Sequence, residues 1–173
     1  IVVVVHGGRW RNRTGDMRSI SHQLAEQGFV AFNITYRLAP KFRYPAAIED
    51  VKAAIQFARE HAKEWHGDPE HIYTWGYSAG AHLALLAGLD LKLHTQGMVG
   101  GGSPTDFIDY PNSPYINPFL GETISQNRNL WLEASPLQHV TDHSPPIFMY
   151  HGEKDEIVGF NQPLKLKTEY EKH

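Results

Sequence analysis

The stretch HIYTWGYSAGAHLALLAGL, residues 71–89, decides the fold. Its first part is rich in aromatic and β-branched residues, as a buried strand is, and its second part is an apolar run long enough for a buried helix. Between them stands Ser78, with Gly76 and Gly80 two residues away on either side. A serine at such a sharp strand-to-helix turn has its hydroxyl lifted above the sheet as a nucleophile. The alternative is a glycine-rich turn whose serine merely caps the helix.

The remaining chain repeats this alternation of strand and helix. We expect strands at 1–6, 29–36, 71–76, 97–103 and 146–152, helices at 17–27, 46–65, 78–91 and 163–173, and short helices around 126–134 in a stretch rich in Pro and Asn. The spacing predicts right-handed crossovers and a mostly parallel sheet, in one α/β domain that spans residues 1–173. The opening strand is apolar at every position, so we expect it inside the sheet and not at an edge.

Composition narrows the possible functions. The chain has 173 residues, of which 41% are hydrophobic and 20% charged, as is typical of one soluble globular domain. Its net charge of −3, with dispersed Lys and Arg, predicts no nucleic-acid partner. It has no cysteine, no histidine spacing typical of a metal site and no apolar run near the ~18–20 residues of a membrane helix, so we expect neither a metal, nor an organic cofactor, nor a membrane span. No targeting signal is visible, and localisation stays open.

A second motif, HGGRW at residues 6–10, follows the first strand. Paired glycines there permit the close backbone approach that an oxyanion hole needs. Gly7 and Gly8 are candidate N–H donors, together with Ala79, the residue after the serine. We interpret His6 as a structural residue that holds this loop. Trp10 either forms a wall of the substrate pocket or covers the core.

Asp155 is the candidate for the acid that orients a catalytic base. It lies in MYHGEKDEIV, three residues beyond the HG that ends the last strand. Glu153 and Glu156 are rivals, and a solvated acidic loop is the alternative interpretation. His151, at the strand end, is interpreted as structural.

These motifs resemble α/β-hydrolases of the esterase/lipase group. The chain is similar to hormone-sensitive-lipase-like carboxylesterases, and closer to the feruloyl/acetyl-xylan-esterase-like (BD-FAE) and kynurenine-formamidase-like branch. The similar segments are HGGRW, YRLAPKFRYPAAIEDVKAAIQFAREHA, GYSAGAHLA, ASPLQHV and PPIFMYHGEKDEIV, which are collinear and cover nearly the whole chain. The resemblance implies a three-layer αβα sandwich whose strands are ordered 4-3-5-6-7 in the family's count, without the family's first strands and last strand.

The resemblance also implies a reaction. Ser78 would be the nucleophile and Asp155 the acid of a triad, and Gly7, Gly8 and Ala79 the oxyanion donors. The expected function is hydrolysis of small-molecule carboxylic esters through an acyl-enzyme. Two alternatives are an arylformamidase or amidase with the same triad, and a non-catalytic relative that only binds.

The resemblance leaves the triad without its histidine. In this fold the histidine follows the acid after one more helix and one more strand, and only His173 follows Asp155. A helix from Pro163 to His173 runs ~15 Å back along the sheet, at 1.5 Å per residue. His173 is therefore expected at the opposite edge, and His82, His139 and His143 are also poor candidates. We expect the chain to be truncated at both ends, with its base beyond residue 173, and to be nearly inert, because loss of the base costs on the order of 10⁶ in kcat.

Residues 104–134 are expected to contribute to the substrate pocket. Besides Trp10, we single out Phe119 and Trp131 as pocket residues. Other candidates are Phe107, Tyr110, Tyr115 and Leu120. These side chains could equally form core beneath a long loop. The resemblance alone suggests short acyl, acetyl or feruloyl groups, and the sequence does not indicate an oligomeric state.

Overall fold

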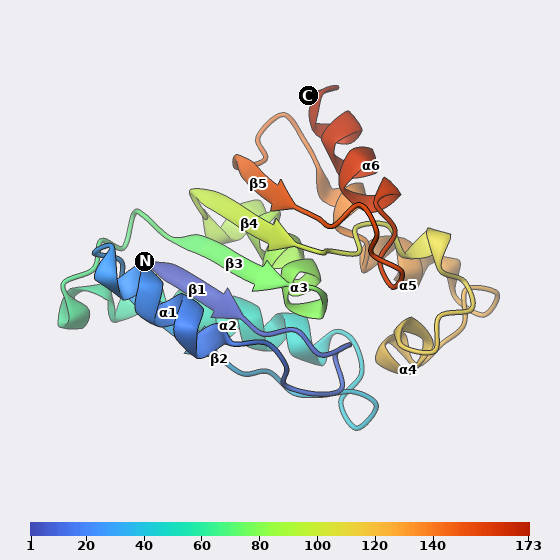
Figure 1. Ribbon diagram of the computed structural model, residues 1–173, viewed down its shortest axis with the longest axis horizontal. Coiled ribbons are helices and arrows are strands. Elements are labelled where there is room, and N and C mark those ends of the chain that lie inside the picture. The colour runs from blue at the N-terminus through green and yellow to red at the C-terminus, as the bar shows by residue number, and fades with distance from the viewer.

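Five parallel strands form one sheet in the order β2-β1-β3-β4-β5, in a computed structural model that describes all 173 residues (Figure 1). The strands are β1 (Val2–Val5), β2 (Ala31–Ile34), β3 (Tyr73–Tyr77), β4 (Gly97–Gly101) and β5 (Ile147–Tyr150). Every neighbouring pair is parallel. This is the strand order that the sequence predicts, and it confirms that the opening strand lies inside the sheet.

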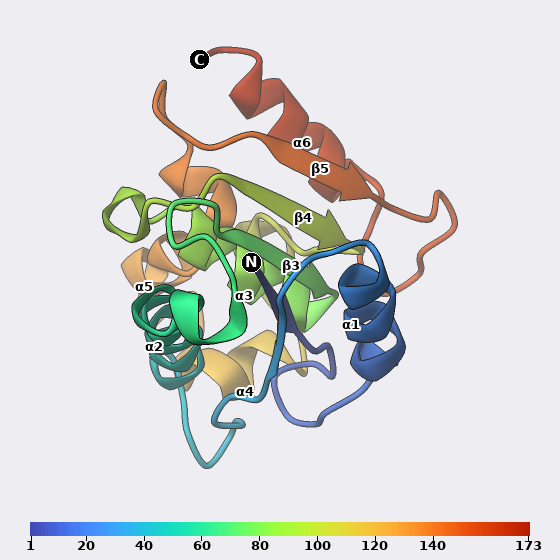
Figure 2. The ribbon, with the colours of Figure 1, turned by 90° about the vertical axis from the view of Figure 1, so that its left-hand side faces the viewer.

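Helices cover both faces of this sheet (Figure 2). They are α1 (Met17–Glu26), α2 (Ala46–Glu60), α3 (Ala79–Gly88), α4 (Ile116–Leu120), α5 (Arg128–Glu133) and α6 (Asn161–Tyr170). Helix α1 lies on one face, and α2 and α3 lie on the other. Helices α4 and α5 lie beyond the carboxyl ends of the strands. No helix has the length and apolarity needed to cross a membrane.

The side chains of β1 explain why three layers form. Val3 and Val5 point into the large core beneath α2 and α3, whereas Val2 and Val4 point to the other face, where they pack with Met17 of α1. All four valines are buried. Because alternate side chains of a strand point to opposite faces, a strand that is apolar at every position needs helices on both sides.

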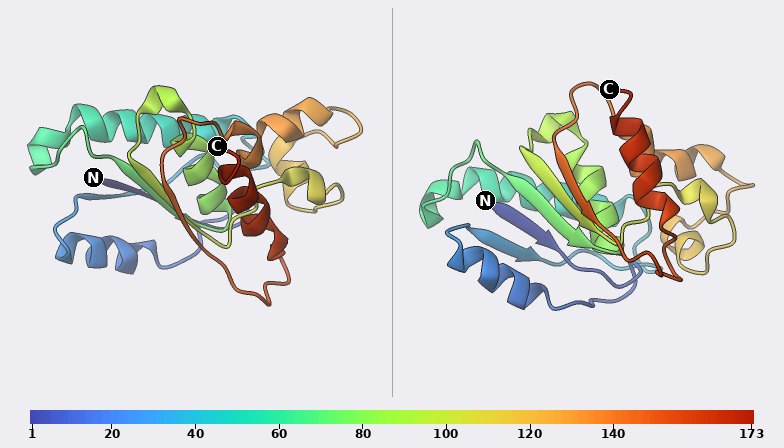
Figure 3. Two further views of the ribbon diagram at one scale, coloured as in Figure 1. Left: turned by 90° about the horizontal axis from the view of Figure 1, so that it is seen from above. Right: turned by 45° about the horizontal axis from the view of Figure 1, so that its top comes forward.

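The strand register brings three loops to one edge of the sheet. Val5 is paired with Gly76, and Gly101 is paired with both Tyr77 and Tyr150. Strands β1, β3 and β5 therefore end nearly level, and the loops that follow them meet at the same edge (Figure 3). HGGRW, GYSAG and HGEKD lie in or next to these loops, as the sequence predicts.

Several elements differ from expectation. The strand predicted at 29–36 is shortened to Ala31–Ile34, and the helices predicted at 78–91 and 163–173 span Ala79–Gly88 and Asn161–Tyr170. The helix predicted at 46–65 ends at Glu60, and a short 3₁₀ turn, Ala62–Trp65, completes the segment. The strand predicted at 97–103 pairs only over Gly97–Gly101. Helix α4 lies outside the range of 126–134 in which short helices were expected. It contains Pro118, which is tolerated because residues in the first turn of a helix need no intrahelical N–H donor.

Candidate active site

Ser78 lies at a sharp turn between β3 and α3. Its backbone has φ 55° and ψ −123°, a conformation that non-glycine residues rarely adopt and that is often found at functional sites. Its N–H donates to the Gly101 carbonyl at 2.7 Å. Ser78 stands immediately before α3, yet its hydroxyl makes no capping hydrogen bond to the helix. The Ser78 hydroxyl therefore does not cap α3 in this structure.

Glycines around Ser78 permit close backbone packing. A β-carbon on Gly80 would collide with the carbonyl oxygen of Val5, and one on Gly76 with that of Gly80. A β-carbon on Gly7 would lie 2.9 Å from the Tyr77 carbonyl oxygen and 3.5 Å from the β-carbon of Ser78. The loop after β1 therefore lies directly against the turn that carries the serine, as the motifs predict.

His6 holds the base of this loop. Its Nδ1 lies 2.7 Å from the Gly7 carbonyl oxygen, and its ring stacks on Tyr36 at a centroid distance of 4.2 Å. The Tyr36 hydroxyl donates to the His6 carbonyl at 3.1 Å. His6 is buried, and burial lowers its pKa, which favours the neutral imidazole. These contacts are those of a structural residue.

The last three residues of HGGRW share a left-handed backbone. Gly8, Arg9 and Trp10 have φ values of 122°, 59° and 58°. Trp10 anchors the segment: its ring stacks on Phe119 at 4.7 Å, and its Nε1 donates to Nδ1 of His82 at 3.2 Å. Trp10 both lines the cavity beside Ser78 and belongs to the core, so this residue has both of the positions considered for it.

His82 is a core residue. Because its Nδ1 accepts from Trp10, its Nε2 carries the proton and donates to the Ala134 carbonyl at 2.7 Å. Its ring also stacks on Phe107 at 4.5 Å. Complete burial lowers the pKa of His82 to about 4. With both nitrogens engaged, His82 has none free for Ser78.

Asp155 lies across the cleft from the HGGRW loop and lines one cavity together with Ser78. Its Oδ1 accepts from the N–H groups of Ile157 and Val158, both at 2.9 Å. Its Oδ2 lies 3.7 Å from Nε2 of His151, beyond hydrogen-bonding distance. One carboxylate oxygen is thus fixed by the backbone, and the other is left available.

The neighbours of Asp155 have other positions. Glu153 is exposed and lines neither cavity at Ser78. Glu156 lines an adjoining groove, which shares Tyr110, Ser113, Tyr115 and Ile157 with these cavities. The His151 side chain is 1% exposed, and its Nε2 donates to the Val158 carbonyl at 2.7 Å. His151 therefore secures the loop that carries Asp155.

Two cavities meet at Ser78. The smaller has a volume of about 40 Å³ and the larger about 520 Å³, and Arg9, Ser78, Ile157 and Val158 line both. The smaller is mainly apolar. Its remaining lining residues are Trp10, Ala79, Pro104, Tyr110, Ser113, Tyr115 and Ile116. Together they form one cleft, called the Ser78 cleft below.

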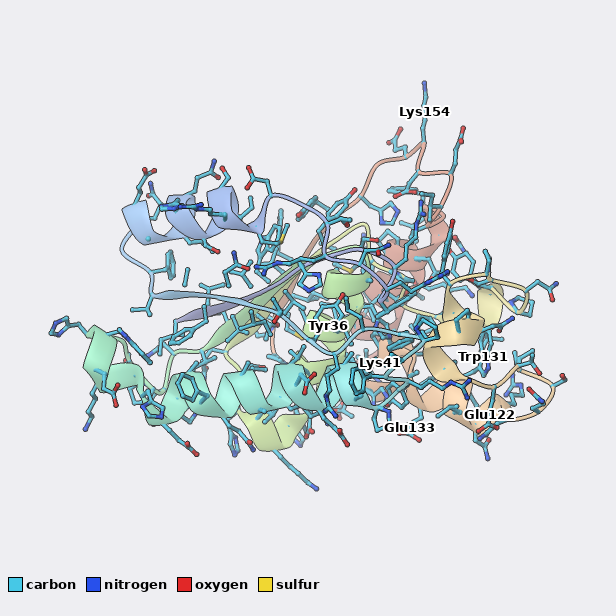
Figure 4. The ribbon with its side chains drawn as sticks, turned by 90° about the horizontal axis from the view of Figure 1, so that it is seen from below. Tyr36, Lys41, Glu122, Trp131, Glu133 and Lys154 are labelled. Carbon is cyan, nitrogen blue, oxygen red and sulfur yellow. The ribbon has the colours of Figure 1, made fainter.

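Four residues expected in the pocket lie in the core instead: Phe119, Trp131, Phe107 and Leu120. Phe119 and Trp131 are fully buried and line neither cavity of the cleft. Phe119 lies behind Trp10, and Nε1 of Trp131 donates to the Glu122 carbonyl at 3.0 Å. Figure 4 shows Trp131 within the α4–α5 segment, well away from Lys154 on the loop after β5. The large apolar rings of Phe119 and Trp131 stabilise the segment that carries Tyr110 and Tyr115.

No histidine of residues 1–173 lines the Ser78 cleft. Nδ1 of His173 lies 2.6 Å from Asp142, in the loop that enters β5 from the opposite edge, as the helix geometry predicts. His139 Nε2 bonds to the Glu133 carbonyl. The sequence also gave no indication that Arg9 would line the cleft, because the direction of its side chain depends on the left-handed backbone of the loop.

The three-layer sandwich, with its sharp turn at Ser78 and the glycine loop beside it, has the fold of the α/β-hydrolases. It superposes on the acetyl ester-xyloside bifunctional hydrolase from Caldicellulosiruptor lactoaceticus with a TM-score of 0.91 and 26% identity, over 99% of this chain and 68% of that one. A truncated carbohydrate esterase from gut microbiota gives 0.89 and 25%, over 99% and 72%. The chain belongs to the BD-FAE family, which it matches over residues 1–170.

Curated relatives are also esterases by name. Esterase LipQ of Mycobacterium tuberculosis is 31% identical over 91% of this chain and 42% of its own length. Esterase LipC of the same organism is 31% identical over 94% of this chain and 46% of its own length. The chain thus spans less than half the length of these relatives.

Proposed function

We propose that residues 1–173 carry the nucleophile, the oxyanion donors and the acid of a serine hydrolase that cleaves carboxylic esters. The observation that carries this proposal is the turn at Ser78. The serine hydroxyl does not cap α3, Ser78 and Asp155 line the same cavity, and the turn packs against Gly7. The esterase names of the relatives support the choice of an ester as substrate.

In the proposed reaction Ser78 Oγ attacks the ester carbonyl carbon as a base removes the hydroxyl proton. The tetrahedral intermediate collapses to an acyl-enzyme, and the alcohol leaves with a proton from the base. Water, activated by the same base, then attacks the acyl-enzyme and releases the acid. The cleft binds the two portions of the ester on either side of Ser78.

Backbone N–H groups would stabilise the oxyanion. The Gly7 carbonyl is engaged by the N–H of Thr14 at 3.1 Å and by His6 at 2.7 Å. Because C=O and N–H of a trans peptide point in opposite directions, the N–H of Gly8 points away from Thr14. Ala79 begins α3, where the N–H has no partner within the helix and the helix dipole favours negative charge. Gly7, Gly8 and Ala79 are the proposed donors.

Asp155 would orient the base through its free oxygen. The two N–H groups on Oδ1 fix the carboxylate, and His151 fixes the same loop through the Val158 carbonyl. Oδ2 can then accept the Nδ1–H of an imidazole, which sets its tautomer and leaves Nε2 to face Ser78.

We further propose that this imidazole belongs to a histidine outside residues 1–173. The histidines within these residues are bonded elsewhere or lie away from the cleft, as described above. The polypeptide of residues 1–173 is therefore expected to be nearly inert, with kcat lower by on the order of 10⁶ than in a complete triad.

The test compares the polypeptide of residues 1–173 with the product of the complete reading frame, both assayed on p-nitrophenyl acetate and on N-formylkynurenine. We expect ester turnover by the full product, its loss in Ser78→Ala, and no effect of Ser125→Ala, an exposed serine between α4 and α5. If the full product hydrolysed the formamide but not the ester, the proposed substrate class would be amides and not esters. Full activity of the Ser78→Ala variant would overturn the mechanism.

A further inference from the structure

Arg9 places an unpaired positive charge in the Ser78 cleft. Its side chain lines both cavities, and its guanidinium lies over the ring of Tyr115, 4.5 Å from the centroid. Arg37 is the only arginine of the chain that forms salt bridges with carboxylates. The charge of Arg9 is therefore free to act on a ligand.

The backbone fixes where Arg9 points. The residue after it, Trp10, is buried and held by Phe119 and His82. With the tryptophan anchored in the core, the left-handed conformation at Arg9 directs its side chain outward, over the cleft. The Tyr115 ring holds the guanidinium by a cation–π contact, which leaves its N–H groups available.

The charges around the cleft favour an anion near Arg9. Arg9 is the only charged residue in the lining of the smaller cavity, which is mainly apolar, and electrostatic interactions are stronger beside apolar walls. The larger cavity adds Lys154 and Asp155. Asp155 has one oxygen engaged by two N–H groups, which offset part of its charge. Asp109 and Glu156 line an adjoining groove that shares Tyr115 with the cleft, so the excess of positive charge is confined to the residues that line the cleft itself.

We propose that the Ser78 cleft selects esters that carry a carboxylate a few bonds from the scissile carbonyl, and that Arg9 binds this carboxylate. The planar guanidinium suits a carboxylate because it offers two parallel N–H donors. This inference rests on the ester hydrolase function proposed above. It assigns Arg9 to substrate binding and not to the chemical step.

The test uses matched ester pairs on the product of the complete reading frame. One pair is 4-acetoxybenzoate and its neutral analogue 4-acetoxybenzamide, which differ on the alcohol side. The other is monomethyl succinate and methyl levulinate, which differ on the acyl side. We expect kcat/KM to be roughly fivefold higher for the anionic member of at least one pair, mainly through KM, and this preference to weaken as salt screens the charges.

Variants assign this preference to a residue. Arg9→Gln should bring the ratio of kcat/KM between the anionic and the neutral member of the pair close to one, and Arg9→Lys should retain part of the wild-type ratio. Arg11→Gln is the matched control, because Arg11 is exposed and lines neither cavity. Equal kcat/KM within both pairs, or a preference that survives Arg9→Gln, would overturn this inference alone. No turnover of any of the four esters would instead contradict the proposed function.

Discussion

Nε1 of Trp10 donates a hydrogen bond to Nδ1 of His82 at 3.2 Å, and this bond joins the loop after β1 to the helix after β3. The two segments are 72 residues apart in the chain. Both border the Ser78 cleft, so the bond fixes the proposed oxyanion donors relative to Ser78. It exists only while His82 is neutral, because a protonated Nδ1 cannot accept.

Protonation of His82 is therefore expected to destabilise the fold. Its pKa is about 4 in the folded protein, and that of an unfolded histidine is about 6.5. The unfolded state binds more protons between these values, so the stability present above pH 6.5 is lost as pH falls towards 4, by about 3 kcal/mol in total. Chemical denaturation between pH 4 and 7.5 measures this loss.

Two variants isolate the contribution of His82. His82→Gln keeps a donor and an acceptor but does not titrate, so its unfolding free energy should depend less on pH in this range. The exposed His143→Gln variant should retain the wild-type dependence. If His82→Gln also retained it, the acid sensitivity would arise elsewhere.

Gly7→Ala tests whether turnover depends on the close approach of the HGGRW loop to Ser78. The added methyl group would lie 2.9 Å from the Tyr77 carbonyl oxygen, so the loop must move away from Ser78. We expect a stability cost of about 1–3 kcal/mol. We also expect kcat/KM of the full product to fall by about 10²–10³, as when an oxyanion donor is lost.

The control for this variant is Gly28→Ala. Gly28 has φ 87° and open space around it, so the alanine costs stability through the backbone alone and lies away from the cleft. Its kcat/KM should be unchanged. An equal fall in both variants would mean that destabilisation, and not the loop position, controls turnover.

The two oxygens of Asp155 should have separable roles. Asp155→Asn keeps an oxygen for the N–H groups of Ile157 and Val158 but cannot set the tautomer of a histidine, so kcat should fall by about 10⁴ with a small change in stability. Asp155→Ala should also destabilise the loop by about 1–3 kcal/mol. Hydrogen exchange at these two amides should accelerate in the alanine variant alone; unchanged exchange there would contradict the structural role of Oδ1.

The sequence predicts the sheet because its signals are local and repeated. Every position of β1 is a valine, and a strand of this kind must be covered on both faces. Alternation with helices then implies parallel pairing and level strand ends. The turn at Ser78 follows from two glycines at fixed spacing, and the structure adds that its hydroxyl does not cap α3.

The pocket could not be predicted in the same way. Phe119 and Trp131 are aromatic residues of the kind that often line pockets, yet the α4–α5 segment folds back so that they face the core. Tyr110 and Tyr115, from the same stretch, line the cleft. Which aromatic side chain faces the ligand depends on long-range packing that no local pattern records.

The reactivity of Ser78 is the central claim, and location of a covalent adduct tests it most directly. The product of the complete reading frame is treated with a fluorophosphonate and digested with trypsin, which releases residues 64–92, a peptide with Ser78 as its only serine. We predict one stoichiometric adduct on Ser78 and none in the Ser78→Ala variant. An unmodified Ser78 in the folded protein, or an equal adduct in both proteins, would contradict the account.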